Sequence, residues 1–250
     1  MIRRLAFLLA VLPLAGTAAA ERPAECLIAQ HQIEYIFPLP QVARAIAAKK
    51  LNVLVLGSAS STLPGSNGVK DAYPARLQKA LTESLPGVAV KVIADVKPHR
   101  TAEAMVATLK GELSAAKPAL MIWQTGTVDA IQTVDPDQFT ATLSRGIAMA
   151  AAAGADVILV NPQYSPRTES MIALSTYTDD MRWVALQHGI PLFDRFEIMR
   201  LWSDLGTFDF TAAADKLAIA SRVHNCVGWL LTDLIIGAAK PDGPHTEGGQ

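Results

Sequence analysis

The chain has no excess of charge of either sign and few aromatic residues. Its 250 residues carry a formal net charge of -1, and aromatic residues make up 6% of the composition. No cluster of Lys and Arg stands out, so nucleic acid and anionic membrane surfaces are poor candidates as partners. Apolar residues reach 50%, largely through alanine, yet only the amino-terminal region contains a long apolar run. We therefore expect no membrane-spanning helix beyond that region.

The sequence also lacks the patterns that bind metals and phosphates. Its two cysteines are isolated, and its five histidines show no paired ligand spacing, which argues against a zinc site. The segment GSASST at 57–62 has neither the second glycine nor the lysine of a phosphate-binding loop. We expect no metal and no cofactor.

The amino terminus is typical of a secretory signal. Arg3 and Arg4 precede an apolar stretch at 5–15, and three alanines at 18–20 follow. This pattern predicts cleavage after Ala20, because a signal peptide has a basic start, an apolar segment too short to span a bilayer and small residues at the cleavage site. The expected organisation is a signal peptide at 1–20, one domain at 21–240 and a polar, disordered tail at 241–250. The mature protein would be periplasmic or secreted, without membrane insertion.

The two cysteines, Cys26 and Cys226, lie near opposite ends of the mature chain. In an oxidising compartment a lone pair of this kind often closes a disulfide, and we predict that bridge. Two separate buried thiols are the alternative.

Strands and helices alternate along the chain with short connections. Short apolar runs predict strands at 51–57, 88–93, 119–124, 155–160 and 191–193. Helical periodicity predicts the helices 42–49, 71–85, one opening at Thr101, one opening at Asp135, 170–187, 196–201 and 217–236. This order predicts a single three-layer α/β/α domain with a mostly parallel, five-stranded, flavodoxin-like sheet.

Three turns follow strands of this predicted sheet. They begin at Gly57, Gly126 and Asn161. Because right-handed crossovers place the carboxyl ends of parallel strands on one edge, these turns should face a common crevice. Gln163, Tyr164 and Arg167 follow the last of them and either line the crevice or form a plain loop. Asp194, Arg195 and Asp209 are interpreted as surface or structural ion-pair residues.

The chain resembles the SGNH (GDSL-type) hydrolases over residues 26–235. The matching segments, in family order, are VLVLGSASST, AYPARL, PALMIWQTGTVDA, DVILVNPQYSPR, PLFDRFEIMRLW and CVGWLLTDLI. The resemblance implies acyl transfer on a small-molecule ester or acylated glycan. A serine after the first strand attacks the ester, a histidine oriented by an aspartate three residues earlier accepts its proton, and a glycine and an asparagine help to stabilise the oxyanion.

This sequence departs from the family pattern at the reacting positions. The spacing from Gly57 to Tyr73 needs no gap, which places Ala59 where the nucleophile belongs. The turn of Gly126 carries Val128 in place of the oxyanion asparagine, followed by Asp129. The segment 95–100 (DVKPHR) lacks the glycine of the second turn. The final Asp-x-x-His motif aligns with Asp215 and Ala218, so the histidine is absent.

A relocated triad is an alternative to loss of activity. Ser58, Ser60 or Ser61 could act as the nucleophile if the turn register shifted, and His224 could act as the base with Asp129 or Asp215 behind it. His224 otherwise reads as a capping or half-buried histidine, and His99 as a loop residue. Two hypotheses follow: an exported ester hydrolase with relocated groups, or a non-catalytic relative that binds an acylated glycan or envelope partner.

Overall fold

The computed structural model describes residues 22–27, 29–33, 35–212 and 214–240. The predicted signal peptide and the tail at 241–250 lie outside these residues. Five strands form one sheet in the order β2-β1-β3-β4-β5, and every pair is parallel. The strands are β1 Lys50–Gly57, β2 Ala89–Val96, β3 Leu120–Gln124, β4 Asp156–Val160 and β5 Leu192–Phe193. This confirms the predicted fold class, with a sheet that is fully parallel.

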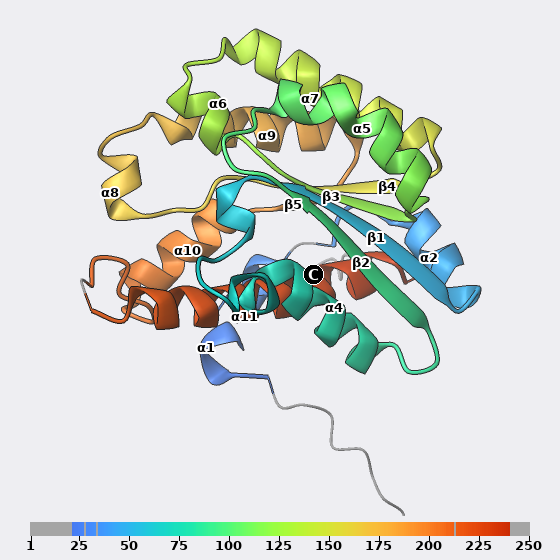
Figure 1. Ribbon diagram of the computed structural model, residues 1–250, viewed down its shortest axis with the longest axis horizontal. Helices are drawn as coiled ribbons and strands as arrows, with labels where there is room; N and C mark the ends of the chain where they lie inside the picture. Colours follow the sequence, from blue (N-terminus) through green and yellow to red (C-terminus); the bar gives the residue numbers. More distant parts are fainter. Residues whose placement is uncertain (1–21, 28, 34, 213, 241–250) are drawn as a thin grey trace, which may run out of the picture.

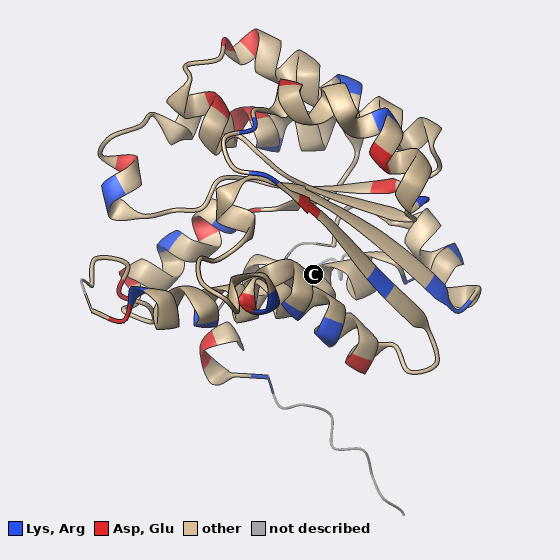
Figure 2. Ribbon diagram, in the orientation of Figure 1, with Lys and Arg blue, Asp and Glu red and all other residues tan. Residues whose placement is uncertain are grey.

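Helices cover both faces of the sheet (Figure 1). One layer contains α5, α6, α7 and α9, and the opposite layer contains α4, α10 and α11. The bounds are α4 Tyr73–Ser84, α5 Ala102–Ala116, α6 Thr127–Ile131, α7 Pro136–Ala152, α9 Leu174–His188, α10 Arg195–Asp204 and α11 Lys216–Ala238. Shorter elements are α1 Ala24–Leu27, η1 Gln30–Gln32, α2 Pro40–Ala47, η2 Ala59–Ser61, α3 Gly68–Asp71 and α8 Pro166–Glu169. Basic and acidic residues are mixed over both layers (Figure 2).

Burial on both faces explains why the central strands are apolar runs without alternation. All five residues of β3 are buried, as are the last five residues of β1, whereas the edge strand β2 is half-exposed. The register pairs Val53 with Leu120 and Leu120 with Asp156, so the strands end near one level. The loops at their carboxyl ends therefore meet at one edge of the sheet.

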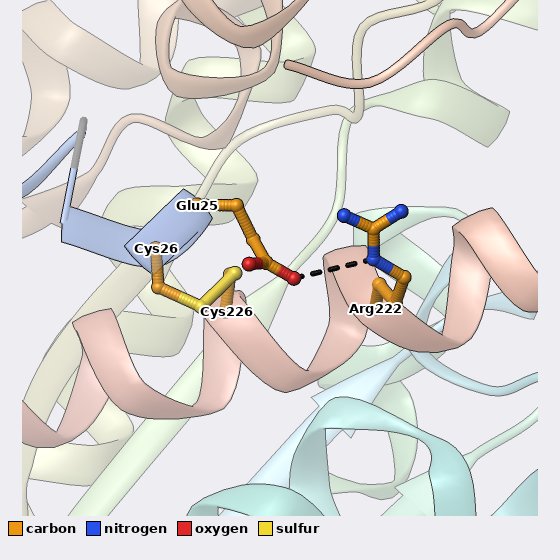
Figure 3. The surroundings of a disulfide bond; sticks show 4 residues. All are labelled: Glu25, Cys26, Arg222 and Cys226. Atoms are coloured by element: carbon orange, nitrogen blue, oxygen red, sulfur yellow. Dashed lines mark hydrogen bonds and ion pairs between the residues drawn. A yellow bond between two sulfur atoms is a disulfide. The ribbon is translucent and has the colours of Figure 1, made fainter. Parts of the chain in front are cut away.

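A disulfide joins Cys26 of α1 to Cys226 of α11, as predicted (Figure 3). Both cysteines are buried, and an ion pair at 3.2 Å between Glu25 and Arg222 lies beside the bridge. The bond fixes the first described helix to the helix that also carries His224.

Local hydrogen bonds account for the differences from the predicted elements. The short helices α1, α3, α6 and α8 were not predicted, and side-chain hydrogen bonds define the last two. The carboxylate of Asp129 accepts the backbone N–H of Gly126 at 3.1 Å and closes the first turn of α6. The hydroxyl of Ser165 accepts the N–H of Thr168 at 3.1 Å and caps α8. As a result, α9 begins at Leu174, four residues later than expected. Within the described residues, no helix is both long enough and apolar enough to cross a membrane.

Candidate functional site

The turn after β1 depends on a close approach that only glycine permits. Ser58 is extended and Ala59–Ser61 form the single turn η2, with the N–H of Ser61 bonded to the carbonyl of Ser58 at 2.9 Å. A Cβ on Gly57 would lie 2.2 Å from the hydroxyl of Ser61. Gly57 therefore allows the serine segment to fold back over the end of the strand.

Two serine hydroxyls of this turn, those of Ser60 and Ser61, donate to Gln124, the last residue of β3. Its side-chain Oε1 accepts hydrogen bonds from the hydroxyls of Ser60 at 3.0 Å and Ser61 at 2.6 Å, and from the N–H of Ser58 at 3.4 Å. Ser61 also lies 3.2 Å from the hydroxyl of Tyr73. Neither hydroxyl is bonded to a histidine, so neither has the base that activates a serine nucleophile.

His224 lies nearby on α11, but its hydrogen bonding is the reverse of a triad histidine. Its Nδ1 accepts the backbone N–H of Tyr73 at 2.9 Å, so in the neutral ring the proton sits on Nε2. In a triad, Nδ1–H donates to a carboxylate and Nε2 is free to accept the serine proton. Burial, and secondly the charge of Arg195, lower the pKa of His224 to about 3. The ring is therefore neutral at physiological pH, with its proton on Nε2.

Asp129 holds the turn after β3 in place. Besides the N–H of Gly126, its carboxylate accepts the hydroxyl of Thr125 at 3.1 Å and the N–H of Ala102 at 2.9 Å. Burial raises its pKa. These bonds attach the turn to α5, and Gly126 supplies the positive φ of +95° that the turn requires. Val128 is half-buried on α6.

The other family-equivalent positions lie outside the pocket. Asp215 has a φ of 57° at the start of α11, and both it and Ala218 are exposed. The α11 residues that do face the pocket are Lys216, Ile219, Ala220, Val223 and His224. The alignment of Asp215 and Ala218 with the family motif thus remains a prediction.

A pocket of about 380 Å³ opens at the carboxyl edge of the sheet. Its walls come from η2, the segment after β4, the helices α10 and α11, and the loop between them. The residues that line it are Ala59, Ser60, Thr62, Leu63, Gln163, Tyr164, Ser165, Arg195, Met199, Asp209, Phe210, Ala212, Lys216, Ile219, Ala220, Val223 and His224. The structure thus brings Ala59, Ser60 and His224 together, whereas Ser58, Gly126, Val128, Asp129, Asp215 and Ala218 do not line this pocket. Of the three residues expected either to line the crevice or to form a plain loop, Gln163 and Tyr164 line the pocket and Arg167 does not.

Arg195, which the sequence interpretation placed at the surface or in an ion pair, is fully buried beneath this pocket. Its guanidinium donates to the carbonyl of Ser60 at 2.9 Å and to Oε1 of Gln163 at 3.2 Å, and it lies 5.8 Å from the ring centre of Tyr73. Its Nε has no hydrogen-bond partner among the described residues. Burial lowers its pKa to about 10, so it remains a cation at physiological pH.

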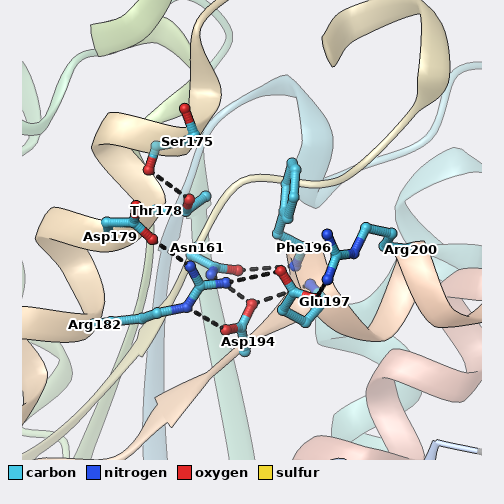
Figure 4. Close-up of polar contacts among 9 residues, drawn as sticks. All are labelled: Asn161, Ser175, Thr178, Asp179, Arg182, Asp194, Phe196, Glu197 and Arg200. Atoms are coloured by element: carbon cyan, nitrogen blue, oxygen red, sulfur yellow. Dashed lines mark hydrogen bonds and ion pairs between the residues drawn. The ribbon is translucent and has the colours of Figure 1, made fainter.

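The neighbouring carboxylates are engaged by another arginine (Figure 4). Arg182 contacts Asp179 at 2.6 Å, Asp194 at 2.7 Å and Glu197 at 3.2 Å. Asp194 also accepts from the amide of Asn161 at 2.7 Å. Although Asp194 precedes Arg195 in sequence, the two side chains form no ion pair, and the charge of Arg195 is not matched by any described carboxylate.

Solved structures of a lipase/acylhydrolase and of an acetylxylan esterase share this α/β fold. The chain belongs to the non-GDSL lipase-like family, whose model matches residues 25–241. A lipase/acylhydrolase from Enterococcus faecalis is similar in structure, with a TM-score of 0.62, 21% identity, and coverage of 78% of this chain and 100% of its own.

Two further solved structures share the fold. TesA has a TM-score of 0.56 and 24% identity, over 73% of this chain and 99% of its own. A catalytic mutant of Axe2, an acetylxylan esterase from Geobacillus stearothermophilus, has a TM-score of 0.59 and 16% identity, over 74% and 93%. The comparison with curated proteins finds no match.

Proposed function

We propose that this protein is an exported, ligand-binding member of its family that does not hydrolyse esters. One observation carries the proposal: Ala59, which the alignment with the family pattern assigns to the nucleophile position, lines the pocket. In a dismantled serine-protease triad, loss of the nucleophile or base costs on the order of a millionfold in turnover. The same loss here would leave a pocket that binds without cleaving.

The groups around Ala59 support this proposal. The Ser60 hydroxyl donates to Gln124, and His224 uses Nδ1 as an acceptor, so Nε2 already carries the ring proton and has no lone pair to accept the proton of a serine. Within the described residues, the structure offers no group of three or more metal-ligating side chains that could activate water instead. A molecule that carries an acyl chain, such as an acylated glycan, is the ligand class that the family relationship favours.

Export is the second part of the proposal. The basic and apolar amino terminus supports it, and so does the disulfide, because such bonds persist mainly in oxidising compartments. The expected destination is the periplasm or the medium.

A relocated esterase is the second candidate, favoured by the fact that Ser60 and His224 line the same pocket. This candidate requires two hydrogen bonds to break: the one from the Ser60 hydroxyl to Gln124, and the one from the N–H of Tyr73 to His224. No described carboxylate bonds to His224 to orient it in that new position.

Turnover of p-nitrophenyl acetate and butyrate separates the two candidates. We expect the purified mature protein to show no saturable turnover, and Ser60→Ala and His224→Ala to leave the background rate unchanged. Saturable turnover that disappears in both variants would contradict the proposal and establish the relocated esterase.

A further inference from the structure

Two side chains that line the pocket, Gln163 and His224, each have a hydrogen-bond donor without a partner among the described residues. Gln163 uses its only acceptor, Oε1, on the guanidinium of Arg195, which leaves its amide N–H groups free. His224 uses Nδ1 on the N–H of Tyr73, which leaves Nε2–H. Neither nitrogen has a hydrogen-bond partner among the described residues. A ligand group that meets both must therefore be an acceptor.

The charge beneath these donors favours an anion. Arg195 is fully buried and has no carboxylate partner, and an uncompensated buried charge is costly unless something else stabilises it. In a site of low dielectric such a cation raises the potential of the space above it. Lys216 adds a second cation at an exposed part of the lining.

Acidic groups do little to cancel this potential. Among the described residues that line the pocket, Asp209 is the one carboxylate. Its Oδ1 accepts from the N–H and hydroxyl of Thr211 at 2.8 and 2.6 Å and from the N–H of Ala212 at 3.1 Å. These neutral donors leave the negative charge of Asp209 in place, but the side chain is exposed, so solvent screens that charge, and it does not pair with Arg195.

The remainder of the lining is apolar. Met199, Phe210, Ile219 and Val223 come from α10, the following loop and α11, and they face the same space as the donors. A pocket of about 380 Å³ lies within the range that encloses small ligands. Its lining therefore combines polar and apolar side chains.

We propose that this pocket binds a carboxylate with a short unbranched apolar chain, the carboxylate over Gln163 and His224 and the chain along Met199 and Val223. This inference rests on the proposed binding function and names the ligand class. It concerns a free acid, whereas the family relationship concerns esters.

Titration calorimetry with octanoate and 1-octanol tests the proposal on the mature protein. The two probes share the apolar chain and differ in the charged head. We expect octanoate to bind at least tenfold more tightly than 1-octanol. Equal affinities, or no octanoate binding, would overturn the inference, and neither result depends on whether p-nitrophenyl esters are hydrolysed.

Gln163→Glu is the decisive variant because it places a carboxylate where Oε1 already meets the Arg195 guanidinium. The new ion pair would cancel the buried charge and remove the amide donors without truncating Arg195. We expect at least a tenfold loss of octanoate affinity, an unchanged 1-octanol affinity and no loss of folding stability. Gln187→Glu, an exposed residue of α9 outside the pocket, is the matched control and should bind octanoate as the wild type does. Full octanoate affinity in Gln163→Glu would overturn the proposal.

Discussion

Replacing Cys26 and Cys226 together by alanine is expected to lower the free energy of unfolding by about 3–5 kcal/mol. The bridge spans 200 residues of sequence, so it removes many conformations from the unfolded chain. The chain-entropy model gives about 5 kcal/mol for a loop of this length, before any strain is subtracted. That is a large share of the stability of an ordinary domain. Urea unfolding of the oxidised wild type and the double variant measures the difference.

Two controls separate the bridge from its surroundings. Glu25→Gln removes the ion pair with Arg222, which is half exposed, and is expected to cost less than about 1 kcal/mol. Thiol titration of the denatured, non-reduced wild type should find no free thiol. A double variant as stable as the wild type, or two titratable thiols, would refute the stabilising bridge.

The second large effect is the loss of stability in acid that His224 produces. The native pKa of about 3 lies below the ordinary value of 6.5, because burial and Arg195 disfavour the charged ring. Between these values the unfolded chain binds a proton that the native state does not. The contribution of His224 is therefore complete above pH 6.5 and is lost as the pH falls toward 3, at about 1.4 kcal/mol per pH unit.

His224→Asn isolates this contribution. The asparagine carbonyl can accept the N–H of Tyr73 in place of Nδ1, and it does not titrate. Between pH 6 and 4 we expect the wild type to lose about 2 kcal/mol more than the variant, measured by urea unfolding at each pH. Parallel stability curves for the two proteins would show that His224 is not held neutral in the native state.

Much of the fold follows from patterns that act locally. The apolar runs of β1, β3 and β4 predict buried parallel strands, and Pro136 after Asp135 predicts the start of α7. The side chain of Asp135 indeed accepts the N–H of Gln138 at 3.1 Å. The short helices α6 and α8 were not predicted because single side-chain hydrogen bonds, rather than apolar periodicity, define them.

The site was only partly predictable. The spacing from Gly57 placed Ala59 at the nucleophile position, and Ala59 does line the pocket. Arg195 was missed because its burial results from packing between distant segments, with Ser60 lying 135 positions away in sequence. The sequence predicts Gln124 as the end of a strand, and no local pattern indicates that its side chain accepts hydrogen bonds from serines of another turn.

The hydrogen-bonding roles of Gln163 and His224 could not be predicted from the sequence either. Each has one acceptor and one donor side, and which side faces the pocket depends on partners far along the chain. The N–H of Tyr73 fixes His224 across 151 positions, and the guanidinium of Arg195 fixes Gln163 across 32. Sequence can place such residues near a crevice, but only the folded partners decide what they offer to a ligand.

Labelling with a fluorophosphonate, followed by intact-mass measurement, tests most directly whether this pocket has lost its nucleophile. Fluorophosphonates bond covalently to serine hydroxyls that an adjacent base activates. Because the family alignment assigns Ala59 to the nucleophile position, and because Ser60 donates to Gln124, we expect the mass of the mature protein to remain unchanged. A single adduct that forms on the wild type and is absent from Ser60→Ala would contradict the account and identify a working esterase.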